Sequence, residues 1–337
     1  MKKASVVILN WNGAELLKKF LPTVLLHTQS EDCEVIVADN ASSDHSVEVM
    51  KQHFPDVKLI LLDKNYGFAE GYNRALQQVE SKYVVLLNSD VETSPNWVNP
   101  LIEHLETNPK TVAVQPKILS YNNKSMFEYA GAAGGFIDRY GYPFCRGRIL
   151  HKLEEDKGQY NKPVEIFWAT GACLCLRRED YIKAGGLDAD FFAHMEEIDL
   201  CWRLLARGKK IACLPQSKVY HVGGASLDSE SPRKVYLNFR NNLLMLYKNT
   251  PFTQLLEVLL MRIVLDTAAV LHFLVQGKWR HASSVIKAYF DFIKKIPHFK
   301  DKRKHNLAQP VQKNIPQLYK GSIIFDFYFR RKRKYSE

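Results

Sequence analysis

The sequence predicts an α/β fold built on a mostly parallel sheet with helices on both faces. Short, continuous runs of aliphatic residues occur at 6–9, 35–38, 57–62 and 83–87. Segments with apolar residues at helical spacing separate these runs, at 14–27, around Val47 and Met50, and at 69–80. Apolar strands that alternate with amphipathic helices are typical of a parallel sheet that is buried on both faces.

The middle of the chain is expected to be less regular. Residues 112–114 and 167–176 look like strands, and residues 121–165, rich in Gly, Tyr and charge, look like a long irregular connection. Short helices are expected at 181–187 and 196–207, the second one ended by Gly208. From residue 235 onward the pattern is helical with basic edges.

The positive charge of the chain belongs to its last third. The formal net charge is +11, but the first 230 residues hold 26 Lys/Arg against 30 Asp/Glu, and residues 231–337 hold 21 against 6. A basic chain end indicates a polyanionic partner, either nucleic acid or an anionic membrane surface. The slightly acidic body argues against a protein that wraps nucleic acid, so no nucleic-acid partner is expected.

Composition excludes several classes of protein. With 46% hydrophobic and 25% charged residues, the chain is neither disordered, collagen-like nor a coiled coil. The six cysteines form no C-x-x-C pair, which argues against a zinc ribbon or a thioredoxin-type motif. Four of them lie in or beside apolar runs, which suits reduced, buried thiols: Cys33, Cys173, Cys175 and Cys213. The first apolar run ends after six residues, too short for a signal peptide, so a cytoplasmic location is expected.

Polar residues gather directly after the predicted strands. Asn10 and Asp39 follow the first two strands, and Asn88 and Asp90 follow the fourth. In open α/β sheets, ligands bind at the carboxyl ends of the strands. The sequence therefore places a ligand site at this edge of the sheet.

Three features carry candidate chemistry, and each also has a structural interpretation. Asp90 offers an oxygen ligand for Mg²⁺ or Mn²⁺, or is a turn aspartate. Glu196, Glu197 and Asp199 crowd three carboxylates into four positions, which suits a general base of raised pKa, or a helix N-terminus that favours acidic residues. His221, before a Gly pair, is either a ligand of a metal or phosphate or a hydrogen-bonded structural histidine.

The order of several motifs resembles that of family 2 glycosyltransferases with the GT-A fold, especially the bacterial rhamnosyltransferase-like branch. The motifs are Val-Ile-Leu-Asn-Trp-Asn at 7–12, Val-Ala-Asp-Asn-Ala-Ser-Ser-Asp at 37–44, Asn-Tyr-Gly-Phe-Ala-Glu-Gly-Tyr-Asn at 65–73, Leu-Leu-Asn-Ser-Asp at 86–90, Trp-Ala-Thr-Gly-Ala-Cys-Leu at 168–174, Glu-Glu-Ile-Asp-Leu-Cys-Trp-Arg at 196–203 and His-Val-Gly-Gly-Ala-Ser at 221–226. The resemblance covers about residues 4–230. It implies a catalytic domain over 1–230, with a nucleotide-binding half at 1–115 and an acceptor-binding half at 116–230, followed by a basic helical extension at 231–337.

The resemblance also implies roles for individual residues. Nucleotide-binding positions are Leu9, Trp11, Asp39, Asn65, Gly67 and Asn73. The sugar and acceptor pocket would hold Trp168, Thr170, Gly171, Asp199 and Arg203. Asp90 and His221 would complete a divalent-metal or diphosphate site. Glu197 is the candidate base, although the family usually has Glu-Asp where this chain has Glu-Glu, which leaves Glu196 as the alternative.

The activity implied is an inverting, metal-dependent transfer of a sugar from a nucleotide-diphosphate sugar to a glycan or lipid-linked acceptor in cell-envelope polysaccharide synthesis. A dTDP- or UDP-linked donor carrying rhamnose or N-acetylhexosamine is expected, and a homodimer is left open. The absence of G-x-G-x-x-G after the first strand argues against a dehydrogenase. The alternative is a membrane-surface adaptor with a degenerate nucleotide-sugar-binding domain.

The C-terminal extension has several features that are typical of segments that contact a membrane. Residues 255–275 look superficially like a membrane span, but Glu257, Arg262, Asp266 and His272 interrupt them, so spanning is not expected. A second amphipathic helix around residues 286–296 either packs on the protein or lies in a bilayer interface. Aromatic residues next to the cationic run at 330–334 favour an interfacial anchor over a solvated tail. The extension is therefore expected to dock on the anionic cytoplasmic leaflet of the inner membrane.

Overall fold

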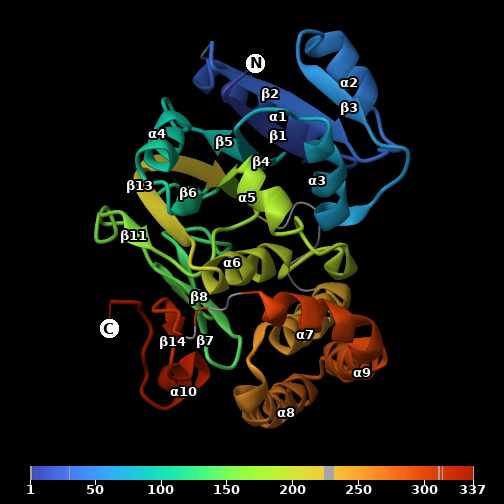
Figure 1. Ribbon diagram of the computed structural model, residues 1–337, viewed down its shortest axis with the longest axis vertical. Coiled ribbons are helices and arrows are strands. Elements are labelled where there is room, and N and C mark those ends of the chain that lie inside the picture. The colour runs from blue at the N-terminus through green and yellow to red at the C-terminus, as the bar shows by residue number, and fades with distance from the viewer. Residues whose placement is uncertain (1, 30, 224–230, 310–311, 313, 337) are drawn as a thin grey trace.

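A large mixed sheet forms the centre of the molecule (Figure 1). The structure is a computed structural model that describes residues 2–29, 31–223, 231–309, 312 and 314–336. Among these residues, the strand order of the main sheet is β11-β13-β6-β12-β4-β1-β2-β3, with β5 paired to β13. The boundary expected at residue 230 and the end of the last motif, residues 224–226, lie outside the described residues.

The N-terminal half has the predicted parallel arrangement. β1 pairs in parallel with both β2 and β4, and β2 pairs in parallel with β3. These elements are β1 Ala4–Asn10, α1 Ala14–His27, β2 Cys33–Asp39, α2 Ser46–His53, β3 Lys58–Leu61, α3 Gly67–Gln77 and β4 Tyr83–Asn88. The expected strands and helices of this half are therefore confirmed to within a few residues.

The other half of the sheet is mixed. β12 runs antiparallel to both β4 and β6, and β13 runs parallel to β6. The elements are β5 Val91–Thr93, α4 Asn99–Thr107, β6 Thr111–Ser120, β11 Val164–Glu165, β12 Cys173–Arg177, α5 Arg178–Lys183, the 3₁₀ turn η1 Ala189–Phe191, α6 Glu196–Ala206 and β13 Lys210–His221. The strand predicted at 112–114 thus extends to residue 120, because it is buried along almost its whole length.

The prediction of an irregular connection over 121–165 was wrong. This segment contributes most of a second, five-stranded sheet in the order β10-β9-β8-β7-β14, with β7 Gly135–Asp138, β8 Pro143–Cys145, β9 Arg148–Ile149, β10 Lys152–Leu153 and β14 Leu318–Tyr319. Its strands are two to four residues long and lie between glycine turns. Such short strands leave too few residues for a readable period-2 pattern.

The strand predicted at 167–176 begins only at Cys173. Residues 167–172 form a loop that joins the two sheets through a single bridge between Gly135 and Trp168. The indole of Trp168 lies on Gly135, where a Cβ would come 2.1 Å from the ring, and its Nε1 donates to Phe136 O at 2.8 Å. The apolar run at 167–169 is therefore buried by packing and not by strand pairing.

The C-terminal helices are α7 Pro232–Asn249, α8 Phe252–Val275, α9 Trp279–Ala308 and α10 Ile323–Tyr328. The helices α7, α8 and α9 pack against one another, and α7 packs against α6. β14 pairs in parallel with β7, and Tyr335 lies among the rings of Phe136, Phe144 and Tyr160. The chain end is thus part of the second sheet and its aromatic core, while Phe325, Tyr328 and Phe329 remain exposed, and the expected interfacial anchor stays a prediction.

By length and composition, α8 is one helix that could cross a membrane, and only 17% of its most apolar window is buried. Two of the charges that argued against spanning, Arg262 and Asp266, are buried against the protein. The helix therefore has a charged inner face and a largely apolar outer face. This division is typical of a helix that covers a protein and meets an apolar environment on its other side.

Two hydrophobic cores lie on the two faces of the main sheet. One gathers side chains from α1, α2, α4 and one face of β1, and the other gathers α3, α6 and the second sheet. All six cysteines are buried and unpaired, which was predicted for Cys33, Cys173, Cys175 and Cys213.

Candidate active site

The polar residues that follow the first, second and fourth strands meet at one edge of the main sheet. Asn10 lies opposite Asp39 in the register of β1 with β2, and Leu9 lies opposite Asn88 in the register of β1 with β4. Parallel pairing brings the carboxyl ends of these strands side by side. The ligand edge predicted from the sequence is therefore present.

Asp39 is held by neighbours at this edge. Its carboxylate accepts hydrogen bonds from Asn10 Nδ2 at 3.0 Å, from the Ser42 backbone N at 2.8 Å and from Ser42 Oγ at 2.7 Å. Trp11, on the loop after β1, exposes 51% of its surface. A fixed carboxylate near an exposed indole is an arrangement that can accept a hydrogen bond from a base and stack against it.

Asn40 ties this edge to the start of α3. Its side-chain amide donates to Asn65 Oδ1 at 3.1 Å and to Gly67 O at 3.0 Å, and its own oxygen accepts from Tyr66 N at 3.0 Å. Gly67 has a φ of +74°, and a Cβ there would come 2.5 Å from the ring of Phe192. Asn65 and Gly67 therefore shape the pocket wall where α3 meets the segment before α6.

Asn73 lies apart from this edge. Its side-chain amide donates to Leu187 O at 2.8 Å, and its oxygen accepts from Leu187 N at 3.0 Å and from the hydroxyl of Tyr181. The carboxamide thus holds the turn after α5 against α3. Its predicted role in the nucleotide pocket has no contact that supports it.

Asp90 and His221 lie together at the same edge. Pairing of β13 with β5 sets His221 opposite Val91, and this brings His221 Nε2 to 3.1 Å from Asp90 Oδ1. The other ring nitrogen lies 3.5 Å from Glu128 Oε1 but makes no hydrogen bond within the described residues. Burial alone would lower the pKa of His221, but the carboxylates of Asp90 and Glu128 outweigh it and raise that pKa to about 10.

Asp90 and His221 fit a divalent cation as a partial ligand set. Among the described residues, no three His, Cys, Asp or Glu side chains are placed so that they could together hold a metal ion. Mg²⁺, however, is usually held by one or two carboxylates together with the phosphates of a substrate. The buried Asp90 carboxylate and the neighbouring His221 Nε2 are the oxygen and nitrogen donors that match this chemistry, whereas the nitrogen that lacks a hydrogen bond, Nδ1, faces Glu128.

The loop before β12 reaches the same edge. Asn88 N donates to Ala172 O at 3.0 Å, and the backbone N of Thr170 donates to Gln115 Oε1 at 3.0 Å. A Cβ at Gly171 would come 3.0 Å from the ring of Phe68, at the start of α3. Thr170 and Gly171 therefore lie between this sheet edge and α3, whereas the buried Trp168 holds the loop by packing on Gly135.

The segment that leads into α6 has an unusual backbone. Phe192, His194 and Met195 have φ values of 66°, 71° and 73°, a region that non-glycine residues rarely adopt. The carbonyl of Phe192 accepts hydrogen bonds from Phe68 N and Ala69 N. Strain of this kind persists only where the surroundings impose it, and it clusters at functional sites.

Glu196 and Glu197 open α6 directly after this strained segment. Each has a buried carboxylate oxygen, Oε2, without a hydrogen-bond partner among the described residues. Burial raises the pKa of Glu197 to about 7. Burial and the neighbouring Glu197 hold the pKa of Glu196 well above its usual range. Glu197 is also the more exposed of the two, so its carboxylate is the better placed to exchange protons near neutral pH.

Asp199 and Arg203 form a buried structural network. Asp199 accepts hydrogen bonds from Arg203 Nε at 2.8 Å, Lys248 Nζ at 2.9 Å and Asn249 Nδ2 at 2.8 Å, and Arg203 also donates to the carbonyls of Ala184 and Gly186. These bonds join α6 to α7 and to the turn after α5. The predicted place of this pair in the acceptor pocket therefore has no contact that supports it.

The sequence did not point to the residues of α7 that hold the strained segment. Asn241 Nδ2 donates to the carbonyls of Phe191, Ala193 and His194 at 2.9, 2.8 and 2.8 Å, and Arg240 donates to those of Asp190 and Phe191. The sequence likewise provided no reason to assign Glu128 and Asn40 to the site. The available signal in α7 was the polar run Arg-Asn-Asn at 240–242, directly before the apolar run at 243–246.

The fold is that of the GT-A class of glycosyltransferases. The structure resembles GalNAc-T7 solved with UDP, GalNAc and Mn²⁺ (TM-score 0.57, 17% identity, 74% of this chain and 48% of that one). It also resembles the mannosyltransferase PcManGT from Pyrobaculum calidifontis in complex with GDP-Man and Mn²⁺ (TM-score 0.51, 15% identity, 91% and 84%). The chain thus spans about half of the first structure and most of the second.

The chain belongs to glycosyl transferase family 2, whose profile matches residues 5–185. It is 26% identical over 232 residues to N-acetylglucosaminyl-diphospho-decaprenol L-rhamnosyltransferase of Mycobacterium tuberculosis, covering 64% of this chain and 75% of that protein. It is 24% identical over 224 residues to rhamnosyltransferase WbbL of Escherichia coli K12, covering 64% and 82%. The family resemblance noted in the sequence is therefore confirmed.

Proposed function

We propose that the protein transfers a sugar from a nucleotide-diphosphate donor to a hydroxyl of a glycan or lipid-linked acceptor in cell-envelope polysaccharide synthesis. The observation that carries this proposal is the meeting, in a family 2 chain, of Asp39, the Asp90–His221 pair and the loop before β12 at one sheet edge. Under this proposal residues 1–115 bind the nucleotide and residues 116–230 the acceptor.

The donor is proposed to lie along the carboxyl ends of β1, β2 and β4. Asp39 would accept a hydrogen bond from the base, Leu9 and Trp11 would flank its ring, and Asn65 and Gly67 would bound the pocket. A dTDP- or UDP-linked sugar is the proposed donor, with rhamnose or N-acetylhexosamine as the transferred group. The names of the bacterial relatives, both rhamnosyltransferases, support rhamnose.

Asp90 and His221 are the residues that would hold a divalent metal, Mg²⁺ or Mn²⁺. When bound, such a metal would neutralise the negative charge that develops on the leaving nucleoside diphosphate. The protein's own part is to present the Asp90 carboxylate from the start of β5 and to hold the His221 imidazole between Asp90 and Glu128. The two structures of similar fold, both solved with Mn²⁺, support this assignment.

Glu197 is the proposed general base. Its carboxylate would remove the proton of the acceptor hydroxyl as that oxygen attacks the anomeric carbon, and the bond from that carbon to the diphosphate would break on the opposite side. A single displacement of this kind inverts the anomeric configuration. The raised pKa of Glu197, about 7, supports the role, because a base is most effective when its pKa lies near the working pH.

The place of action proposed is the cytoplasmic face of the inner membrane, with the basic C-terminal extension on an anionic surface. A lipid-linked acceptor would be held in the same membrane. The extension's excess of 15 positive charges supports this placement.

A transfer assay tests the proposed function. Purified protein with Mn²⁺ would be incubated with dTDP-rhamnose, UDP-N-acetylglucosamine or GDP-mannose and a polyprenyl-diphosphate-N-acetylglucosamine acceptor, and products followed by mass spectrometry. We expect one donor to give a product one sugar heavier, with inverted configuration by NMR. If no nucleotide sugar binds, is transferred or is hydrolysed, the chain is instead a surface adaptor with a degenerate domain.

A further inference from the structure

Exposed apolar side chains are concentrated in the C-terminal helices. Of the 21 large apolar side chains exposed among the described residues, 15 lie between residues 252 and 329. On α8 the exposed set includes Leu256, Leu260, Val264, Leu271 and Val275, with exposed fractions from 56% to 89%. Apolar surface gathered in this way marks a contact surface, whereas isolated exposed apolar residues do not.

Two of the three Asp, Glu and Arg charges of α8 are turned away from this surface, and the third, Glu257, is exposed and pairs with Arg139. Arg262 Nη2 and Asp266 Oδ2 form an ion pair of 2.9 Å, and both side chains are only 2% exposed. Asp266 also accepts from the hydroxyls of Tyr142 and Tyr289, each at 2.7 Å, and Arg262 donates to Tyr140 O and Asn242. The inner face is thus polar and fully bonded, which leaves the outer face apolar.

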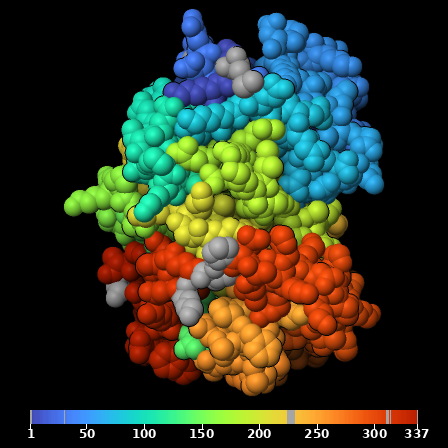
Figure 2. All heavy atoms as spheres, in the orientation of Figure 1, coloured from blue at the N-terminus to red at the C-terminus, as the bar shows by residue number. Residues whose placement is uncertain are grey.

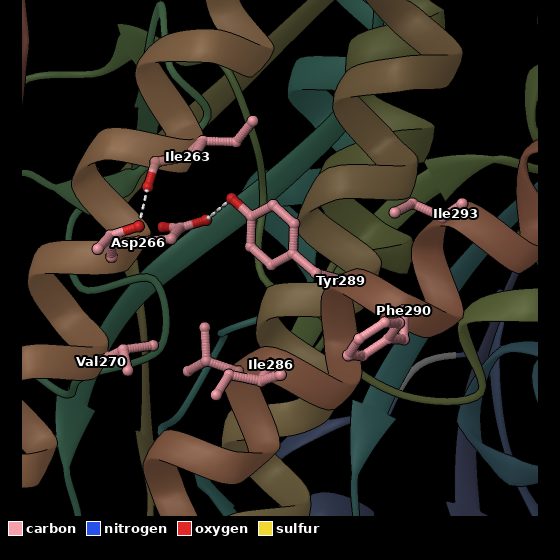
Figure 3. A pocket seen from close by; sticks show the side chains of 9 residues that line it. Ile263, Asp266, Val270, Ile286, Tyr289, Phe290 and Ile293 are labelled. Carbon is pink, nitrogen blue, oxygen red and sulfur yellow. Dashed lines mark hydrogen bonds between the residues drawn. The ribbon is translucent and has the colours of Figure 1, made fainter.

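A groove of about 490 Å³ runs between α8 and α9 and is almost wholly apolar (Figure 3). Its lining residues are Ile263, Asp266, Thr267, Val270, Val285, Ile286, Tyr289, Phe290 and Ile293. The polar atoms in its wall are already bonded, Tyr289 to Asp266 and Thr267 Oγ1 to Ile263 O. The groove therefore suits a hydrocarbon chain, which brings no polar groups of its own.

Basic side chains border the apolar face of α9. Lys287 and Lys294 lie one helical turn before and after Phe290, and Arg280 begins the same helix; all three are exposed. In Figures 1 and 2, α8 lies at the end of the molecule opposite α2 and β3, so this surface is remote from the nucleotide half. Apolar side chains beside cations match an anionic bilayer, whose headgroups are negative and whose interior is hydrocarbon.

We infer that the exposed faces of α8 and α9 form a lipid-docking surface for an anionic bilayer. α8 lies along the membrane plane with its apolar side chains below the headgroups, the groove takes an acyl chain, and Arg280, Lys287 and Lys294 contact lipid phosphates. The inference rests on the proposed function in one respect. The transferase activity supplies the reason for docking, which would bring the active site to a lipid-linked acceptor, whereas the lipid binding itself does not depend on that activity. The sequence favoured the tail at 325–334 as an anchor and left open whether the helix around 286–296 packs on the protein or lies in a bilayer interface.

Vesicle co-sedimentation of the full chain tests this surface. The vesicles are phosphatidylcholine alone or with 30% phosphatidylglycerol. The test variant carries Ile263→Ser, Phe290→Ser and Ile293→Ser, and the matched control carries Leu26→Ser, Leu61→Ser and Ile182→Ser, three apolar residues that are equally exposed elsewhere. Circular dichroism melting confirms that each variant is folded.

We expect the wild type and the control to bind the anionic vesicles, and the test variant to bind at least tenfold less. A Lys287→Gln, Lys294→Gln variant should lose the preference for anionic vesicles. Equal binding by the test variant and the wild type would overturn the inference. So would a wild-type dimer that the test variant converts to monomer without any vesicle binding, since a second copy then covers the face. Transfer to a water-soluble acceptor tests the enzyme separately and should be the same in all these variants.

Discussion

Asn241 donates its side-chain amide to the carbonyl of His194 at 2.8 Å, across the junction between the C-terminal helices and the active site. The same amide also bonds the carbonyls of Phe191 and Ala193. Three residues of this segment have positive φ values. The hydrogen bonds from α7 therefore maintain a backbone that would relax without them, and this backbone sets the direction in which α6 presents Glu197.

Asn241→Ala is expected to lower kcat by 10- to 100-fold with a small change in KM for the donor. Release of the strained segment would displace the base, and small displacements of a catalytic group are costly. Steady-state kinetics at saturating donor measures the effect. Asn238→Ala, half-buried on the same helix, is the control and should keep wild-type kcat; an equal loss in both would mean that α7 is merely destabilised.

Asp90→Ala should abolish most transfer while leaving the fold intact. The carboxylate lies at an edge and its main described partner is His221, so its loss removes a ligand and not a core contact. Titration of donor by calorimetry, with and without Mn²⁺, is the measurement. The wild type should bind the donor more tightly with Mn²⁺, and the variant should lose that difference; a Mn²⁺ effect that survives in Asp90→Ala contradicts the assignment.

The rate should depend on pH through Glu197. Burial raises the pKa of this carboxyl to about 7, so the basic form dominates only above that pH. We expect kcat/KM to fall about tenfold per unit as the pH drops below 7 and to level off above it, since kcat/KM reports the free enzyme. A profile that stays flat down to pH 5 would mean that a group with an ordinary carboxyl pKa acts as the base.

The buried ion pair of Arg262 and Asp266 on α8 is expected to affect the stability of the fold. Arg262→Met leaves Asp266 charged and buried, a situation that costs about 3–5 kcal/mol. Denaturant unfolding should show this loss, and Arg262→Met combined with Asp266→Leu should be less destabilised than the single variant. Lys183→Met, which breaks the exposed Glu179–Lys183 pair, should cost about 0–1 kcal/mol. If Arg262→Met and Lys183→Met lower the free energy of unfolding by similar amounts, the buried ion pair contributes no more to stability than the exposed one.

The sequence predicted the parallel half of the fold well because each of its strands is a continuous apolar run between amphipathic helices. The second sheet was missed because its strands are very short and because β7 pairs with β14, whose Leu318 lies opposite Ile137 from a distant part of the chain. Asp39 and Asp90 were expected at the ligand edge because they follow apolar runs, and His221 was named from its motif; their functional roles stay predictions. Asp199 and Arg203 looked the same in sequence as pocket residues. In the structure Asp199 bonds to Lys248 and Asn249, about 50 residues downstream, and Arg203 bonds to Asp199 and to two backbone carbonyls.

The central claim is that Glu197 is the base of a sugar transfer, and Glu197→Gln tests it most directly. At pH 8 the variant should unfold at the same temperature as the wild type or higher. A carboxyl whose pKa is raised on folding costs stability as the pH rises from its ordinary value through about 7, and glutamine removes that cost.

The measurement is single-turnover transfer by Glu197→Gln at saturating donor, beside Glu196→Gln. We predict that Glu197→Gln binds the donor normally but transfers 10²- to 10⁴-fold more slowly, and that Glu196→Gln retains more of the rate. Near-normal transfer by Glu197→Gln would contradict the account and assign the base to Glu196.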